Sequence, residues 1–304
     1  MEPVVTAIAG FHVVGTRYPI AALVWKIQDK SRVKLNALGL ELFDLAPVSC
    51  PHDVSRKDEF HKYMQFACSK VPSLFHMTKF NMVAYLDVDM MPLRNIDELL
   101  AMDLKEGEIA MVSNPSSPGE FSPTSGLPKG PKFAFNGGLM VLRPSDAVAQ
   151  QFTSFLDKLR GNQKGHKSAR ADQLLTARYF EGHVRALSVT YNWAPWNMCF
   201  HKSGLENYAI QHPPAMIHFS GNIKMWTNNS PLNKFAQTFS GSECGRLGMK
   251  WMCAWQFTSK AVNRVLKDCT ANCARLLRQS MEERSMECDL GMANHTLPKS
   301  RSVP

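Results

Sequence analysis

Residues 82–92, MVAYLDVDMMP, place two aspartates directly after a short apolar run, and this segment constrains the fold more than any other. The run from Met82 to Leu86 is short for a helix and has the Val, Tyr and Leu content of a buried strand. Because side chains alternate between the two faces of a strand, we predict that Asp87 and Asp89 project to the same side and that Val88 points into the core.

Two carboxylates on one side of a strand end repel each other, and a hard divalent cation bound through oxygen ligands relieves that repulsion. The sequence therefore predicts a Mg²⁺ or Mn²⁺ site at this strand end. A solvated turn is the alternative for an isolated Asp-x-Asp pair. A calcium loop is excluded because Pro92 stands where such a loop requires glycine.

Strand-like and helix-like segments alternate along the first half of the chain. The residue patterns predict strands over 20–25, 41–45, 82–86, 109–112 and 139–142. They predict helices over 4–14, 31–38, 58–69, 96–102 and 146–159. This order is typical of an α/β fold with a mainly parallel central sheet flanked by helices, in which ligands bind where strands end.

Three segments outside that strand end carry further candidate residues. Asn136 to Gly138 precede an apolar strand and permit a close backbone approach, although a hairpin turn is the alternative. Asp172 stands near a helix start, where capping would be its ordinary role. His218 is a suitable Mn²⁺ ligand, Gly221 permits close approach, and Lys224 can reach a phosphate. Taken singly, a histidine at this position is more often a core residue than a ligand, and a lysine is more often simply exposed.

The segment 113–132 is rich in proline and long for a loop. Two interpretations of it remain open and carry equal weight: a lid over a substrate and a disordered insertion. Beyond residue 228 the pattern is less regular, and apolar spacing predicts one helix over 261–281, followed by disorder from 289. We therefore expect a domain over 1–228 and a basic, cysteine-containing extension over 229–304.

The composition is that of a globular protein, with 44% hydrophobic residues, and its net charge of +9 attracts anions such as nucleotide phosphates, acidic lipid surfaces or polyanionic glycans. The longest nearly apolar stretch, 4–14, is too short to span a bilayer. Eight cysteines without a Cys-x-x-Cys pair argue against structural zinc. The compartment stays open between cytoplasm, if Met1 is the true start, and the secretory pathway, if a leader has been lost.

Four segments in order, YLDVDMMPLRNIDELL, FNGGLMVLRPS, ADQLL and HFSGNIKMW, resemble the glycogenin-like glycosyltransferases of family 8 over residues 5–228. The resemblance implies a GT-A type fold and a retaining hexosyltransferase. It also implies a Mn²⁺ cofactor, with Mg²⁺ as a second possibility, and a uridine diphosphate sugar, UDP-glucose first, as donor. The expected acceptor is a glycan, a protein or a lipid, and a homodimer is an open possibility, whereas nucleic acid is not an expected partner.

Residue by residue, the resemblance assigns three groups of functional side chains. The implied metal ligands are Asp87, Asp89 and His218. The implied catalytic pair near the reacting carbon is Asp172 and Gln173. The implied donor-binding residues are Lys70, Asp87, Val88, Asp89, Asn136, Gly137, Gly138, Gly221 and Lys224.

Two departures from the family pattern bear on activity. The chain starts in the first helix, so the family's first strand, which grips the nucleobase, is expected to be missing. Pro72 interrupts the segment in which family members continue a helix past the lysine that Lys70 matches. Because the first strand is expected to be missing, the alternative function is a catalytically weak or inactive binding or scaffold protein. A phosphohydrolase ranks last because it would need a second metal cluster. For self-glycosylation, Tyr191 and Tyr208 are the positional candidates.

Overall fold

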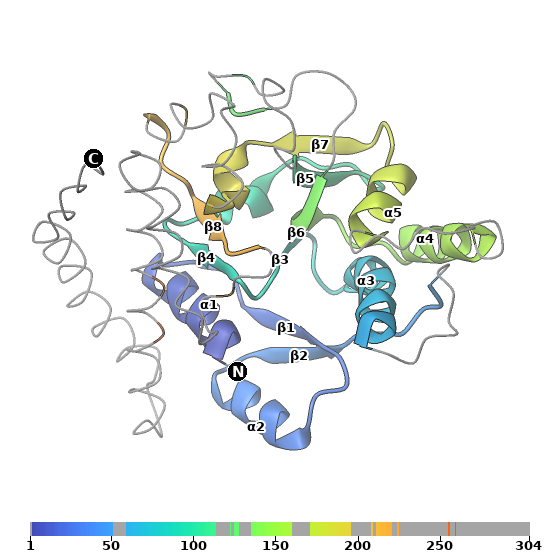
Figure 1. The fold of residues 1–304 in the computed structure, drawn as a ribbon, viewed down its shortest axis with the longest axis horizontal. Helices are drawn as coiled ribbons and strands as arrows, with labels where there is room; N and C mark the ends of the chain where they lie inside the picture. The colour runs from blue at the N-terminus through green and yellow to red at the C-terminus, as the bar shows by residue number, and fades with distance from the viewer. Residues whose placement is uncertain are drawn as a thin grey trace, which may run out of the picture.

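The computed structural model describes residues 2–50, 59–113, 122, 125–127, 135–159, 171–195, 208, 211–220, 224, 255 and 259 (Figure 1). The helices within these residues are α1 (Glu2–Val13), α2 (Asp29–Ala37), α3 (Glu59–Phe75), α4 (Asp146–Leu159) and α5 (Ala171–Tyr179), with 3₁₀ helices η1 (Asp97–Ala101) and η2 (Val189–Asn192). The strands are β1 (Ala21–Val24), β2 (Glu41–Asp44), β3 (Val83–Leu86), β4 (Met90–Pro92), β5 (Ile109–Ser113), β6 (Phe135–Leu142), β7 (Val184–Leu187) and β8 (Met216–His218). Each element predicted before residue 160 has an observed counterpart, and the helix predicted over 261–281 lies outside the described residues.

The central sheet is mixed, with the strand order β3-β6-β5-β7. Strand β6 runs antiparallel to both β3 and β5, whereas β5 and β7 are parallel. The α/β architecture is confirmed. The expectation of a mainly parallel sheet was wrong, because β6 lies between two strands that run in the opposite direction. Its apolar run could not reveal this direction, because a strand buried on both faces is apolar in either orientation.

Helices α3, α4 and α5 pack together beside the central sheet (Figure 1). Helix α4 buries Val148, Ala149, Phe152 and Leu156, which recur at helical spacing and so form one apolar stripe. The Phe152 ring meets the Tyr179 ring of α5 edge-on, with centroids 4.9 Å apart. Helix α4 thereby packs against α3 and α5, and α5 in turn contacts β6.

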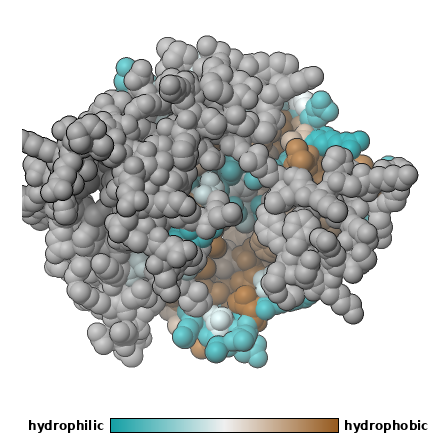
Figure 2. Space-filling view, in the orientation of Figure 1, coloured by the Kyte–Doolittle hydropathy of each residue, from teal (hydrophilic) through white to brown (hydrophobic). Residues whose placement is uncertain are grey.

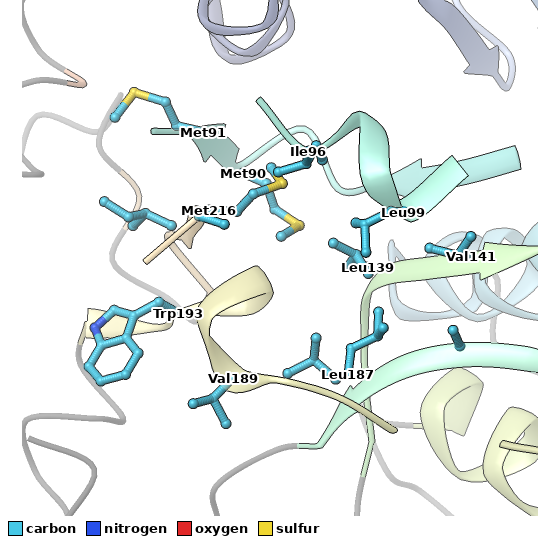
Figure 3. Packing of buried hydrophobic residues seen from close by; sticks show 14 of the residues in the cluster. Met90, Met91, Ile96, Leu99, Leu139, Val141, Leu187, Val189, Trp193 and Met216 are labelled. Atoms are coloured by element: carbon cyan, nitrogen blue, oxygen red, sulfur yellow. The ribbon is translucent and has the colours of Figure 1, made fainter. Parts of the chain in front are cut away.

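A second hydrophobic cluster joins β4, β6, β8 and η2 (Figure 3). Met90, Met216 and Trp193 in this cluster are fully buried. Trp255 belongs to the same cluster and meets the Phe219 ring at 4.9 Å. A side chain beyond residue 228 therefore packs against the core, while the division of the chain at 228 stays a prediction.

Strands β1 and β2 form a separate parallel pair connected by α2. Both β1 and β3 line a cavity of about 630 Å³. Figure 2 shows a hollow with a hydrophobic floor over β1 in the middle of this face of the molecule. None of these residues tests whether a family strand is missing, and that expectation stays a prediction.

Helix α3 continues through Pro72 to Phe75, so the prediction that it ends at Ser69 was wrong. Proline removes one helical hydrogen bond. Burial of Leu74 and Phe75 on the far side of the proline favours continuation. The hydroxyl of Ser69 also accepts a hydrogen bond from the Val48 amide at 2.9 Å, and a disulfide joins Cys50 to Cys68 in the same region.

No helix among the described residues combines the length and apolar character needed to cross a bilayer.

Replacing Phe152 by alanine should lower the free energy of unfolding by about 3–5 kcal/mol, because it opens a cavity among buried aromatic rings. Leu174→Ala on the exposed side of α5 is the control and should change stability by less than about 0.5 kcal/mol. Urea unfolding followed by fluorescence measures both. Equal losses for the two variants would contradict the packing described here.

Candidate metal centre

Asp87 and Asp89 lie in the tight turn between β3 and β4, where the Met90 amide donates to the Asp87 carbonyl at 3.1 Å. The two carboxylates converge as expected, but for a different reason. Strand β3 ends at Leu86, and Val88 is half exposed instead of pointing into the core. A turn, not strand alternation, aims both carboxylates at one point.

Strand β8 brings His218 to that point from far along the sequence. It pairs antiparallel with β4, with Met90 opposite His218, and the Phe219 amide donates to the Asp89 carbonyl at 2.9 Å. The His218 Nε2 atom lies 3.3 Å from Asp89 Oδ1 and 3.8 Å from Asp87 Oδ2. Since the side chains of His218 and Asp89 are almost fully buried, these contacts are shielded from solvent.

These three side chains fit a divalent cation. One ligand atom from each lies within 4.8 Å of the others. Adjacent ligands of an octahedral ion are about 3 Å apart, so the observed separations need little change to accept one. Two carboxylate oxygens and one imidazole nitrogen form a donor set that suits Mn²⁺.

Lys224 supplies positive charge to the same cluster. Its ammonium group contacts the Asp89 carboxylate and donates to the Phe219 carbonyl at 3.1 Å. Burial alone would raise the pKa of Asp89, but hydrogen bonds and charge from His218 and Lys224 lower this pKa to about 2. Asp89 is therefore a carboxylate over the whole physiological range and is available as a ligand.

Tyr85 and Lys70 connect the metal ligands to α3. The Tyr85 hydroxyl donates to Asp87 Oδ1 at 2.6 Å, and the Lys70 ammonium lies 4.8 Å from the centre of the Tyr85 ring. The buried Lys70 also donates to the Gly137 carbonyl at 3.2 Å. The predicted lysine thus lies beside the predicted glycine segment, and its role toward a donor stays a prediction.

Residues Asn136 to Gly138 lie inside β6, whereas the sequence had suggested that they precede the strand. The Gly138 carbonyl accepts the Asp87 amide at 2.8 Å. A Cβ atom on Gly138 would lie 2.4 Å from Cε1 of His218. Glycine is therefore needed here because an imidazole packs directly against the backbone.

The remaining predicted residues have less structural definition. Asp172 and Gln173 stand in the first turn of α5, which packs against β6. The side chain of Asp172 and all of Gly221 lie outside the described residues. Tyr208 is buried with its hydroxyl 3.2 Å from Ser188 Oγ, and Tyr191 donates to Glu98 at 3.0 Å.

Two residues of the site were not anticipated from the sequence. Tyr85 stands two positions before Asp87, a spacing that in the strand predicted from the sequence would put both on one face, so a signal for it existed. Asn192 lies 2.8 Å from His218 at the end of η2, and nothing in its local sequence marks it.

Residues 6–230 match the family model described as Glycosyl transferase family 8. The chain belongs to this family. A glycogenin from Cryptococcus neoformans is 28% identical to this family 8 chain over 184 residues, which are 54% of the chain. The chain spans only 17% of the length of that glycogenin.

Two solved glycosyltransferase structures resemble the family 8 chain in fold. The galactosyltransferase LgtC, solved with donor and acceptor sugar analogues, has a TM-score of 0.54 at 18% identity and covers 81% of this chain and 91% of its own. GlyE from Streptococcus pneumoniae has a TM-score of 0.51 at 18% identity and covers 82% of this chain and 59% of its own. These likenesses confirm the predicted GT-A type fold.

Gly138→Ala should weaken Mn²⁺ binding at least about tenfold, because the added methyl group displaces the His218 ring from the aspartates. Gly107→Ala is the matched control. It is strained by a φ of +80° but meets open space, so it should cost about 1 kcal/mol of stability and leave Mn²⁺ affinity unchanged. Titration with Mn²⁺ followed by electron paramagnetic resonance separates the two effects, and equal affinities would contradict the close approach.

The pH dependence of stability should report Asp89. Its folded pKa of about 2 lies below the ordinary 3.8, so its ionised form stabilises the fold above pH 3.8, and this stabilisation disappears as the pH falls to about 2. The expected loss is roughly 2 kcal/mol. When urea unfolding is measured in EDTA above pH 3.8 and again near pH 2, the Asp89→Asn variant should not show this loss of stability. The same pH slope in wild type and variant would contradict it.

Proposed function

We propose that this chain is a metal-dependent retaining glycosyltransferase, which moves a hexosyl group, glucose first, from a uridine diphosphate sugar to an acceptor hydroxyl. The observation that carries the proposal is the convergence of Asp87, Asp89 and His218, with Lys224 on the same carboxylate. Family membership supports the reaction class. The sugar, the nucleotide and the stereochemistry are part of the proposal.

The chemistry requires charge stabilisation on the leaving group. The bond between the anomeric carbon and the diphosphate oxygen breaks, a bond from that carbon to the acceptor oxygen forms, and the acceptor proton must be removed. In the proposed role, Asp87, Asp89 and His218 hold a Mn²⁺ or Mg²⁺ ion, which supplies positive charge against the departing diphosphate. The buried setting strengthens that interaction.

Lys224 provides a second positive charge that can change partner. In the structure its ammonium group neutralises Asp89. A cation on the carboxylates would take over that neutralisation, and we propose that Lys224 then turns to the donor diphosphate. The negative donor and the positive ion thus enter the site without leaving a buried charge unpaired.

The other predicted residues surround the metal centre in this proposal. Asn136 to Gly138 contact the donor sugar, and Lys70 donates a hydrogen bond to the Gly137 carbonyl. Val88 is half exposed between the aspartates, and in this proposal its backbone contacts the donor. Asp172 and Gln173 act near the reacting carbon, and Gly221 approaches the diphosphate.

The acceptor is proposed to be a hydroxyl of another molecule, whether a glycan, a protein or a lipid. Tyr208 is buried and bonded to Ser188, and Tyr191 donates to Glu98 beneath the Arg94 guanidinium. Both hydroxyls are engaged within the fold, which does not favour either tyrosine as a self-glycosylation site.

Hydrolysis of a panel of nucleotide sugars with Mn²⁺ tests the proposed function. Asp89→Asn should lower turnover at least about 100-fold, because a ligand of the ion that stabilises the leaving group is lost. Asp103→Asn removes an exposed carboxylate near η1 and should leave turnover unchanged.

Equal turnover for wild type and Asp89→Asn would remove the metal role. If wild type binds Mn²⁺ but consumes no nucleotide sugar in the panel, with or without added acceptors, the scaffold alternative replaces the enzyme.

A further inference from the structure

Asn192 is the buried partner of the metal-site histidine. Its Oδ1 atom lies 2.8 Å from Nδ1 of His218, on the side of the ring opposite the two aspartates. Asn192 is 3% exposed and His218 is 4% exposed, so water does not compete for this contact. The contact joins η2 to the end of β8.

The orientation of this pair follows from a backbone amide. The Gly138 N–H can only donate, and it lies 2.8 Å from the Asn136 side chain, so the atom it faces is the oxygen. That same oxygen lies 3.0 Å from Asn192, which must therefore present its NH₂ group. The other side-chain atom of Asn192 is then its oxygen, and it faces His218.

An amide oxygen only accepts, so Nδ1 of His218 must carry a hydrogen. In the metal-free structure Nε2 can also carry a hydrogen toward Asp89, and a cation that takes its place meets the Nε2 lone pair of the neutral imidazole. Nε2 is the atom that faces Asp87 and Asp89. One backbone N–H on β6 thereby fixes, through two amide side chains, which nitrogen of His218 is available as a ligand.

The backbone holds the two partners at this distance. The Trp193 amide donates to the Met216 carbonyl at 3.0 Å, and the His218 amide donates to the Trp193 carbonyl at 2.8 Å. Asn192 is thus attached, through its neighbour, to the strand that carries the histidine. A partner that is anchored by main-chain bonds restricts rotation of the ring as well as its tautomer.

We propose that Asn192 is a positioning residue that holds His218 as an Nε2 ligand of the cation. The inference rests on the proposed metal role of this site. It predicts that loss of the Asn192 oxygen weakens metal binding although Asn192 touches neither metal nor donor. Second-sphere partners of histidine ligands contribute about 10–100-fold in metal affinity.

Mn²⁺ binding to three variants tests the proposal. Asn192→Leu removes both polar contacts at nearly constant volume and should weaken Mn²⁺ binding about 10–100-fold. Asn192→Asp keeps an acceptor for Nδ1 but turns a carboxylate oxygen toward the Asn136 oxygen, so it should lose less Mn²⁺ affinity than Asn192→Leu. Thr190→Val removes a different buried polar group of η2, a hydroxyl bonded to Ser188 and not to His218, and should bind Mn²⁺ like wild type.

A spectroscopic measurement distinguishes positioning from general loosening of the fold. Electron spin echo measurements on the Mn²⁺ complexes detect nitrogen modulation from a coordinated imidazole. Wild type and Asn192→Asp should show it, and Asn192→Leu, loaded at high Mn²⁺, should show much less. Thermal unfolding without metal confirms that each variant is folded.

The outcomes separate the two proposals. If wild type itself does not bind Mn²⁺, the metal role fails and the positioning role fails with it. If wild type binds with nitrogen modulation and Asn192→Leu matches it in affinity and modulation, only the role of Asn192 is overturned. Equal losses in Asn192→Leu and Thr190→Val would also overturn it, because they would show a general effect of disturbing η2.

Discussion

The pairing of β4 with β8 is the interaction on which the site depends. Each strand has three residues, all buried, and such short strands gain little from their own backbone bonds. The pair persists because Met90 and Met216 pack within the cluster shown in Figure 3. The apolar core therefore determines the distance between an aspartate and a histidine that are remote in sequence.

Charge compensation is the second constraint. Asp89 is buried, and an unpaired buried carboxylate would be costly, so the fold surrounds it with His218 and Lys224. The same arrangement leaves the site able to exchange partners, since a cation can replace the lysine ammonium. In the proposed function the site admits a divalent ion and a diphosphate, and a lysine on a flexible stem supplies a positive charge that can follow them.

The sequence predicted the elements and the three converging side chains better than it predicted how they converge. Period and turn residues revealed the helices and strands before residue 160, and the motif order revealed the family. The direction of β6 could not be predicted, since its neighbours are chosen by tertiary packing. Val88 was misplaced because the strand ends one residue before Asp87, and strand ends are set by the partner strand. Asn192 carried no signal because its role exists only once η2 and β8 are adjacent.

The contact between Trp255 and Phe219 links a residue beyond 228 to the strand that carries His218. Phe219 directly follows His218, and its amide bonds the Asp89 carbonyl. A protein shortened at the predicted boundary would leave the Phe219 ring without its indole neighbour, one residue from a proposed metal ligand. The packed core next to the candidate metal centre therefore includes a residue, Trp255, that lies beyond the family-matched region.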